Sequence, residues 1–411
     1  MARRMGKYDV VIIGGGPSGA IAAARLNKLG CTVLILEKSI FPRFVIGESL
    51  LPQCMDYLKD LDLLGVVAEE NFQVKTGACF FHNDNVCEFN FEQQFTDGWN
   101  YTYQVKRADF DQALINELIK RGIEVEFQAT VKGFEGDQQQ QRITYTNKDG
   151  DTLEVESRFV IDASGFGRVL PNLLNLSVEA ESVPRGAVYS HFTDENKPEG
   201  ASNNIYVHAF NNNTAWVWSI PFSDQTASVG LVGGDNFIKE CAENDGLKFT
   251  EMIKNFPLLS ERYKSSQMLM PARTTMNYAK GVKSLYGAGF VLCGNATEFL
   301  DPIFSSGVTL AMASGNKAAV LVADHLKGKS VNWEADYKSF VLQGIDVFRS
   351  YVHAWYDGTL QTIFFAPTIN EDYKKQICSV LAGYVWDDTN PFVTKHEHIL
   401  TTLAKVIAIQ N

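Results

Sequence analysis

Short apolar runs alternate with amphipathic stretches over the first part of the chain. Residues 10–13 are all Val or Ile and are predicted to form a buried strand, and residues 32–36 are predicted to form a second one. Between them, residues 20–29 combine small and apolar side chains in a helical pattern. This strand–helix–strand order is typical of one half of a doubly wound parallel sheet.

Similar patterns continue along the chain. Residues 107–121 carry an apolar stripe at helical spacing and are predicted to form a helix that covers the first sheet. Long alternating segments at 185–233 predict an antiparallel sheet. Further strands are predicted at 79–82, 86–91, 101–105, 124–134, 142–146, 153–156, 158–162 and 289–294, with helices at 52–64, 235–260 and 308–326 and mostly helical structure from residue 332.

These elements predict an α/β protein, in which a Rossmann-type domain carries an inserted antiparallel β-sheet domain and a helical C-terminal segment. A chain of 411 residues is longer than one hydrophobic core usually fills. We expect the Rossmann-type domain to be discontinuous, because its strands lie far apart in the sequence. The expected boundaries are 1–75, 100–180 and 280–330 for that domain, 76–99 and 181–279 for the inserted sheet, and 331–411 for the C-terminal segment.

The composition narrows the choice of partners and location. A formal net charge of -11 disfavours binding to nucleic acid or to anionic membranes. No apolar run is long enough to span a bilayer. The basic residues at 1–4 before an apolar run could indicate a signal peptide, but the glycine-rich turn that follows fits a cofactor-binding strand better. Seven scattered cysteines without a CxxC pair favour reduced thiols in the cytoplasm.

A glycine motif follows the first strand. Gly14, Gly16 and Gly19 have the spacing G-x-G-x-x-G, and a helix follows them. Gly14 permits the tight turn, Gly16 lets a pyrophosphate approach the backbone, and Gly19 lets the helix pack closely on the strand. The N-terminus of that helix offers free N–H groups and a partial positive charge to phosphates. The motif therefore predicts a dinucleotide site.

Glu37 ends the second strand, where it is placed to accept hydrogen bonds from the 2′- and 3′-hydroxyls of a ribose. A 2′-phosphate would be repelled by this carboxylate, so NADP is disfavoured at the site. A glycine-rich turn that binds nothing is the alternative. The complete order of strand, glycines, helix, strand and acid argues against it.

Three turns together resemble a known family. The turns at 14–19, 162–165 and 294–296 occur in the order found in two-domain FAD monooxygenases of the aromatic-hydroxylase type. Residues 216–221 match the W-x-W-x-I-P signature of flavin-dependent halogenases, and residues 299–308 resemble their flavin- and halide-side loop. The resemblance covers most of residues 5–330. Phe304 stands where tryptophan-type halogenases carry a glutamate, so the chain looks more like the phenol- and pyrrole-type branch.

The resemblance implies an aromatic-hydroxylase-like FAD-binding domain and assigns its residues. Asn295 replaces the usual acid on the ribityl chain, and its amide can still form that hydrogen bond. The N–H groups of Ser306 and Gly307 could also hold a halide ion. The implied FAD-binding residues are Gly14, Gly16, Pro17, Ser18, Gly19, Glu37, Lys38, Arg43, Ser49, Arg107, Asp162, Gly165, Gly294, Asn295, Asp301, Ser306, Gly307 and Val308.

The resemblance also implies a reaction. In such halogenases reduced FAD and oxygen form a hydroperoxide, a halide converts it to hypohalous acid, and a lysine holds that oxidant beside an electron-rich aromatic ring. Lys75 matches the position of this lysine, although a surface lysine before a strand is the alternative. Trp216, Trp218 and Pro221 would wall the flavin off from the substrate. The two tryptophans share one face of a strand and could instead only fill a core.

The sequence leaves alternatives for the substrate, the source of reduced FAD and the reaction. The substrate would be a small aromatic compound, and the short C-terminal segment would also suit one carried on a carrier protein. Reduced FAD would come from a separate reductase or from NAD(P)H bound transiently. No metal site is expected, since His396 and His398 fit a solvated helix face better than a ligand set. The alternatives are an FAD-dependent monooxygenase, a reductase of the geranylgeranyl-reductase type, and a flavin-binding protein without turnover.

Overall fold

An eight-stranded sheet forms the first layer of the protein. The structure is a computed structural model that describes residues 3–83, 85–179, 184–197 and 202–410. The order of the sheet is β18-β19-β10-β1-β2-β7, with the hairpin β8–β9 attached to β10. Its strands are β1 (Arg3–Ile13), β2 (Val33–Glu37), β7 (Glu124–Phe127), β8 (Thr130–Gly136), β9 (Gln141–Thr146), β10 (Thr152–Asp162), β18 (Tyr286–Gly287) and β19 (Phe290–Leu292).

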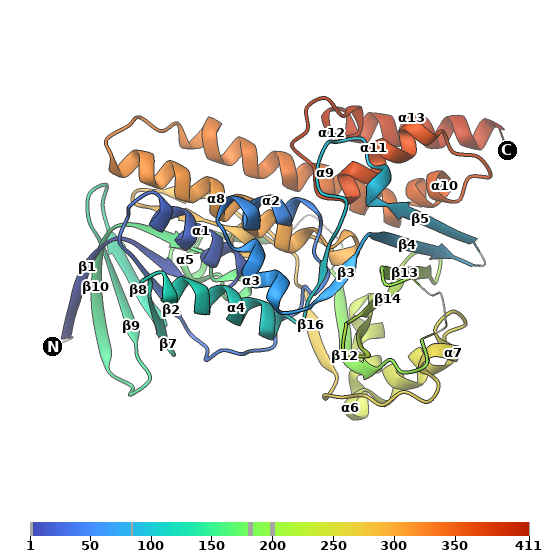
Figure 1. The fold of residues 1–411 in the computed structure, drawn as a ribbon, viewed down its shortest axis with the longest axis horizontal. Coiled ribbons are helices and arrows are strands. Elements are labelled where there is room, and N and C mark those ends of the chain that lie inside the picture. The colour runs from blue at the N-terminus through green and yellow to red at the C-terminus, as the bar shows by residue number, and fades with distance from the viewer. Residues whose placement is uncertain (1–2, 84, 180–183, 198–201, 411) are drawn as a thin grey trace.

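Residues 10–13 of the first strand are all apolar because both faces of this part of the strand are covered. Val10 and Ile12 pack against the layer of α1 (Pro17–Lys28), α4 (Arg107–Lys120) and α8 (Ser306–Leu326), which lies along the sheet in Figure 1. Val11 and Ile13 pack with side chains of the β8–β9 hairpin and of α5 (Val169–Leu173). Strands buried on both faces are typical of parallel sheets.

A seven-stranded sheet forms the second layer, in the order β16-β12-β15-β14-β13-β4-β5. All neighbouring strands run antiparallel except β13 and β4, which are parallel. Helices α6 (Asp235–Asn255) and α7 (Ser260–Tyr263) cover one face. The strands are β4 (Gly77–His82), β5 (Asn85–Asn90), β12 (Gly186–Thr193), β13 (Ile205–Phe210), β14 (Ala215–Pro221), β15 (Thr226–Gly233) and β16 (Arg273–Met276).

The C-terminal helices lie over β4 and β5, at the end of the molecule opposite the N-terminus (Figure 1). They are α9 (Ser339–Tyr356), α10 (Thr359–Phe364), α11 (Glu371–Leu381), α12 (Pro391–Thr394) and α13 (His396–Gln410). The remaining elements connect the layers: α2 (Gln53–Asp60), α3 (Leu64–Glu69), the pair β3 (Gln73–Lys75) and β6 (Thr102–Gln104), and the pair β11 (Ser177–Glu179) and β17 (Lys280–Val282).

Three predicted elements differ in detail. The strand expected at 124–134 is two strands, because Gln128 adopts a left-handed conformation with φ of 57°. The helix expected at 235–260 is interrupted at 243–246, where three successive residues have positive φ. The strands expected at 153–156 and 158–162 are one strand, since β10 pairs with β9 on one edge and with β1 on the other. The expected division into three parts remains a proposal.

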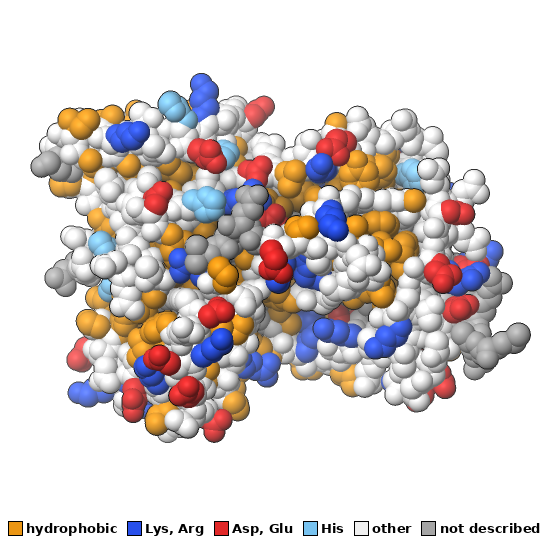
Figure 2. All heavy atoms as spheres, turned by 180° about the vertical axis from the view of Figure 1, so that it is seen from behind, with side chains coloured by type: hydrophobic (Ala, Val, Ile, Leu, Met, Phe, Trp, Pro, Cys, Tyr) orange, Lys and Arg blue, Asp and Glu red, His pale blue; other side chains and the backbone are white. Residues whose placement is uncertain are grey.

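The surface carries both signs of charge. Acidic and basic side chains are interspersed on the face shown in Figure 2, despite the formal net charge of -11. In the described ranges, no helix is both long and apolar enough to cross a membrane.

Candidate active site

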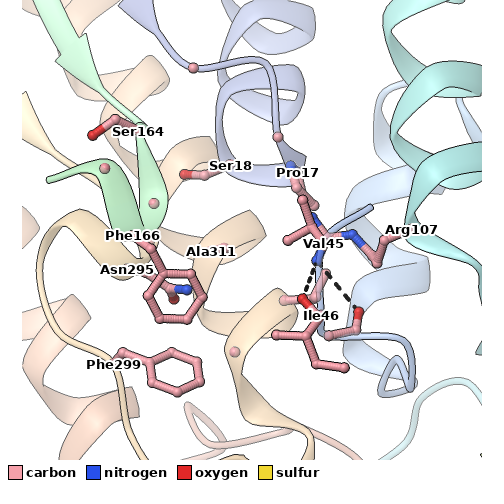
Figure 3. Close-up of a pocket in the computed structure, with 18 of the residues that line it drawn as sticks. Pro17, Ser18, Val45, Ile46, Arg107, Ser164, Phe166, Asn295, Phe299 and Ala311 are labelled. Atoms are coloured by element: carbon pink, nitrogen blue, oxygen red, sulfur yellow. Dashed lines mark hydrogen bonds between the residues drawn. The ribbon is translucent and has the colours of Figure 1, made fainter. Parts of the chain in front are cut away.

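A cavity of about 410 Å³ lies where the two sheets meet. Its first wall consists of the turns that follow β1, β2, β10 and β19. These four strands are parallel, so their carboxyl ends share one edge of the sheet, where such folds bind their ligands. Figure 3 shows Phe166, Asn295 and Phe299 on one side of the cavity and Val45 and Arg107 on the other.

The glycine turn has the geometry that the motif predicts. Gly14 has φ of 101°, and a Cβ there would lie 2.6 Å from the carbonyl oxygen of Ala163. A Cβ on Gly19 would lie 2.0 Å from the carbonyl oxygen of Gly14, so the helix packs on the strand without room for a side chain. A Cβ on Gly16 would meet only Arg43 Nη2, at 3.6 Å, on the side of the cavity.

The N-terminus of α1 fits a phosphate group. It has no side-chain cap and no acidic residue in its first turn. Pro17 and Ser18 line the cavity, and Ser18 Oγ is buried without a hydrogen-bond partner in the described residues. Free N–H groups, a partial positive charge and an unpaired hydroxyl are the donors that a pyrophosphate requires. The residues present therefore fit the dinucleotide part of FAD.

Glu37 lies at the end of β2, 4% exposed, and lines the cavity. Its Oε2 accepts a hydrogen bond from the N–H of Gly15 at 2.8 Å, which ties the acid to the glycine turn. Arg43 Nε lies 3.8 Å from Glu37 Oε1, and Arg43 also lies 4.2 Å above the ring of Phe41. The carboxylate is thus held in place beside the position expected for a ribose. Lys38 lines the same end of the cavity.

Arg107 organises the loop on the other side of the cavity. Asp111, one helical turn later, accepts hydrogen bonds from Arg107 at 2.8 and 2.9 Å and from Arg43 at 2.9 Å. Arg107 Nη1 donates to the carbonyl oxygen of Ile46 at 3.1 Å (Figure 3). Sequence reasoning missed Asp111, although its spacing of four residues from Arg107 is a detectable helical ion-pair signal.

The second sheet closes the cavity with two tryptophans. Trp216, Trp218 and Ile220 line it from β14, and the two indole rings lie 5.6 Å apart. Trp218 Nε1 donates to Ser228 Oγ at 3.1 Å, which fixes the ring. Pro221 ends the strand and is not among the lining residues. The tryptophans therefore form a wall that faces the cavity, not only a core.

Asp301 is not among the residues that line the cavity, and its expected contact with the flavin stays a prediction. Its Oδ2 accepts hydrogen bonds from the hydroxyls of Tyr278 at 2.9 Å and Tyr356 at 2.8 Å, and its Oδ1 accepts one from the N–H of Ile303 at 3.2 Å. Burial raises the pKa of this carboxyl. Tyr356 also accepts a hydrogen bond from Trp216 Nε1 at 2.9 Å. Asp301 thus fixes the turn before α8 and, through Tyr356, the tryptophan wall.

Two other residues expected to bind FAD, Asp162 and Ser306, are also outside the cavity lining. Asp162 is buried below the cavity, where it accepts hydrogen bonds from the N–H groups of Ser164 at 2.9 Å and Leu170 at 2.6 Å. These hydrogen bonds support the turn after β10, and the side chain of Asp162 is outside the cavity lining. Ser306 is likewise buried outside the lining, while Gly307 and Val308 line the cavity at the start of α8. The other expected residues that line it are Ser49, Gly165, Gly294 and Asn295.

Lys75 is 1% exposed and lies behind the cavity wall. Its Nζ donates hydrogen bonds to Ser49 Oγ and to the carbonyl oxygen of Leu50, both at 2.9 Å. Ser49 itself lines the cavity, so one hydroxyl separates the amine from it. Burial lowers the pKa of Lys75 to about 7. A desolvated amine of this kind is partly uncharged near neutral pH.

A carboxylate–imidazole pair at the cavity was not foreseen. Glu48 is 2% exposed and lines the cavity, and its Oε1 lies 2.7 Å from Nε2 of His191 in β12. Its Oε2 has no partner within the described part of the chain. The pair joins the loop at 44–49 to the second sheet. No local pattern could reveal it, because the two residues are 143 positions apart.

Comparisons with known proteins agree with this geometry. A family model described as "FAD binding domain" matches residues 7–337. The 1H-pyrrole-2-carbonyl-(peptidyl-carrier protein) chlorinase of Pseudomonas fluorescens is 27% identical, over 98% of this chain and 93% of that relative. A solved flavoprotein/dehydrogenase of Cytophaga hutchinsonii is 46% identical, covers 98% of this chain and 100% of its own, and has a TM-score of 0.96. The flavin-dependent brominase Bmp2 is 25% identical, with coverages of 99% and 100% and a TM-score of 0.83.

Proposed function

The chain belongs to the FAD binding domain family, and from its similarity to pyrrole-2-carbonyl chlorinases and brominases we propose that it is a halogenase that attaches a halogen atom to an electron-rich aromatic substrate. Its cofactor is FAD, and the enzyme is an FAD-dependent oxidoreductase. The balanced reaction consumes reduced FAD, oxygen, one halide ion, one proton and the aromatic compound. It yields FAD, the halogenated compound and two molecules of water.

The buried amine of Lys75 is the observation that carries the proposal. An isolated buried lysine lowers the stability of the folded protein, since desolvation penalises its charge. Its presence at this position therefore indicates a functional role. Within the described residues no carboxylate pairs with it, and only Ser49 separates it from the cavity. Such an amine can hold hypohalous acid by a hydrogen bond and direct it to a neighbouring ring.

The cavity residues divide the remaining tasks. Bound reduced FAD would supply the two electrons that reduce oxygen to the peroxide level, at which oxygen can oxidise the halide. Trp216 and Trp218 separate the cavity from the organic substrate, so that the halide is oxidised and the substrate is not hydroxylated. The N–H of Gly307, at the N-terminus of α8, is placed to hold the halide. The aromatic ring then takes the halogen from hypohalous acid and loses a proton. That proton and the remaining hydroxyl group form water.

The relatives suggest the kind of substrate. Their names include pyrrole-2-carbonyl groups carried on a peptidyl-carrier protein. We extend this to the present chain and propose a carrier-bound, pyrrole-like ring, with reduced FAD delivered by a separate reductase. We also propose a cytoplasmic location, because each of the seven cysteines is a free thiol and six of them are buried.

A product assay tests the proposal. The protein is combined with FAD, a flavin reductase with NADH, air, bromide and a pyrrole-2-carbonyl thioester, and products are analysed by mass spectrometry. The expected product has bromine in place of a ring hydrogen. A dehydrogenase, the class named for the relative from Cytophaga hutchinsonii, would instead transfer hydrogen without oxygen or bromide. A product of hydrogen transfer that forms in an anaerobic, halide-free reaction would contradict the halogenase proposal.

Tyr356→Phe is expected to loosen the tryptophan wall. The variant removes the hydroxyl that joins Trp216 to Asp301 and leaves the indole N–H unpaired. We expect a loss of stability of about 1–3 kcal/mol and more hydrogen peroxide released per halogenated product. Calorimetry and a peroxide assay measure the two effects. Tyr373→Phe, at an exposed position on α11, is the control, and an unchanged peroxide ratio in Tyr356→Phe would show that the wall does not depend on this contact.

A further inference from the structure

The carboxylate–imidazole pair of Glu48 and His191 extends from the cavity toward solvent. Glu48 lines the cavity, and its Oε1 lies 2.7 Å from His191 Nε2. The side chain of Glu48 is 1% exposed, while that of His191 is 14% exposed. His191 is not among the residues that line the cavity, so its exposed part lies outside the cavity. The pair therefore has one member at the cavity and one that contacts solvent.

Glu48 differs from the other carboxylate at the cavity in having a free oxygen. Among the described residues, Glu37 and Glu48 are the acidic side chains that line the cavity. Both oxygens of Glu37 accept hydrogen bonds, from the N–H groups of Gly15 at 2.8 Å and Ser39 at 2.9 Å. Glu48 Oε2 is buried and has no partner in the part of the chain that the structure describes. A buried oxygen of this kind lowers the stability of the protein unless it has a task.

The loop at 44–49 is anchored without the side chain of Glu48. The N–H of Val105 donates to the carbonyl oxygen of Glu48 at 2.7 Å. Arg107 Nη1 donates to the carbonyl oxygen of Ile46 at 3.1 Å (Figure 3). Both bonds hold the backbone of the loop. A structural role alone therefore does not account for a carboxylate that points one oxygen at an imidazole and leaves the other unpaired.

Two aromatic rings pack against His191 besides its contact with Glu48. Phe44 lies 5.5 Å from the imidazole and Phe222 lies 5.2 Å from it, both edge-on and measured between ring centroids. In the described ranges, Glu48 is the charged side chain that hydrogen-bonds to the imidazole. The cations packed on the two rings, and the acid that pairs with the second cation, are Arg273, Lys106 and Asp224.

The proposed reaction takes up one proton for each halogen atom that is transferred. That proton has to reach the oxygen that is reduced inside the cavity. Imidazole is the side chain that most readily takes up and releases protons near neutral pH. A histidine that contacts solvent and is bonded to a carboxylate at the cavity has the arrangement of a proton shuttle.

We propose that His191 and Glu48 form a proton relay from solvent to the cavity. This inference rests on the proposed function, which creates the demand for protons. His191 takes up a proton from water at Nδ1 and passes the proton on Nε2 to Glu48 Oε1. The carboxyl group then turns about its Cγ–Cδ bond, gives that proton to the oxygen that is reduced in the cavity, and becomes a carboxylate again. The neutral imidazole regains its starting tautomer by exchange with water.

His191→Gln separates proton transfer from hydrogen bonding. The amide of glutamine can still donate to Glu48 Oε1, but it does not take up protons near neutral pH. We expect the halogenation rate to fall ~100-fold and imidazole in the buffer to restore it by about tenfold. Glu48→Gln is expected to cause the same loss without rescue, because the inner member of the relay is missing. His208→Gln, at a half-buried histidine of β13 outside the FAD cavity, is the matched control and is expected to keep the wild-type rate.

Three further measurements do not depend on turnover. FAD affinity and Tm are expected to be the same in His191→Gln and the wild type, because the hydrogen bond to Glu48 is kept. Diethyl pyrocarbonate, applied to the full chain without FAD, is expected to modify His191, as located by mass spectrometry. Weaker FAD binding or a lower Tm in the variant would show that the pair anchors the loop instead. An unmodified His191, or a rate loss that imidazole does not restore, would also overturn the relay.

Peroxide release distinguishes failure of the relay from failure of the proposed function. Oxidation of anionic reduced FAD by oxygen to hydrogen peroxide also takes up one proton and needs no halide. If no halogenated product forms, but peroxide release falls in His191→Gln and is restored by imidazole, the halogenase proposal is wrong and the relay stands. Halogenation at the wild-type rate in both His191→Gln and Glu48→Gln would overturn the relay and leave the halogenase proposal in place. Glu48→Gln and the modification of His191 carry the test if His191→Gln does not fold.

Discussion

Lys75→Ala is expected to abolish halogenation while FAD binding and oxygen consumption continue. The amine of Lys75 donates a hydrogen bond to the hydroxyl of Ser49, and Ser49 lines the cavity. The amine is therefore the group of Lys75 that is connected to the cavity. Without the amine, hypohalous acid has no group to direct it and is lost to solvent. We expect the halogenation rate to fall at least ~100-fold, as when a positioned acid–base group is removed. Product formation, oxygen uptake and FAD fluorescence are measured on one preparation.

Lys239→Ala is the control for this experiment. Lys239 is exposed on α6 and is outside the cavity lining, so its loss is expected to leave all three readouts unchanged. Normal halogenation by Lys75→Ala would show that the buried amine has no part in the reaction. Loss of FAD binding in the variant would show that Lys75 instead supports the cofactor cavity.

Lys75→Met gives a pH signature of the same buried amine. Burial lowers the pKa of Lys75 from 10.5 to about 7, so at pH 7–10.5 the unfolded chain binds more protons than the folded one. The wild type is therefore expected to gain stability as pH rises through this window. Methionine carries no charge, so its stabilising effect is largest below about pH 7 and shrinks toward pH 10.5. Unfolding by urea at several pH values measures this, and a pH-independent difference would contradict the buried charge.

Gly14→Ala is expected to remove FAD binding. A side chain at Gly14 would require φ of 101° and would place its Cβ 2.6 Å from the carbonyl oxygen of Ala163, in a neighbouring strand turn. The turn must move, and the N–H groups of α1 move with it. Strain of about 1–3 kcal/mol is typical of such positions, and displaced phosphate donors add to the loss. We expect FAD affinity to fall at least ~100-fold, as measured by fluorescence titration.

Gly30→Ala separates strain from displacement. Gly30 also has positive φ, 84°, but a Cβ there would meet nothing within 4 Å. This variant is expected to lose some stability and to bind FAD normally. Equal FAD affinity in Gly14→Ala and the wild type would mean that the glycine turn does not hold the dinucleotide.

Local patterns were enough to predict the first βαβ unit and the cavity beside it. The apolar run at 10–13, the glycine spacing and the acid at Glu37 each act over a few residues, and the structure joins them by the hydrogen bond from Gly15 to Glu37. Parallel strands then place the later turns at the same edge. The resemblance to FAD enzymes implied that Gly165 and Asn295 lie near Gly14, although they are far away in the sequence, and all three residues line the cavity.

Long-range partners could not be predicted in the same way. Asp301 was expected at the flavin. In the structure it accepts hydrogen bonds from the hydroxyls of Tyr278 and Tyr356, which are 23 and 55 positions away in the sequence. His191 reaches Glu48 from another sheet. One sequence contains no signal for such pairs, because they depend on how the layers pack. These hydrogen bonds give Asp301 a structural role in the turn before α8 that the sequence did not predict.

A structure of the chain with FAD and bromide tests the central claim most directly. We expect FAD in the cavity between the sheets, with its phosphates at α1, its ring between Trp218 and the start of α8, and an anomalous bromide signal at the N–H of Gly307. FAD bound elsewhere, or a flavin ring whose tryptophan side is open to an organic substrate, would contradict it.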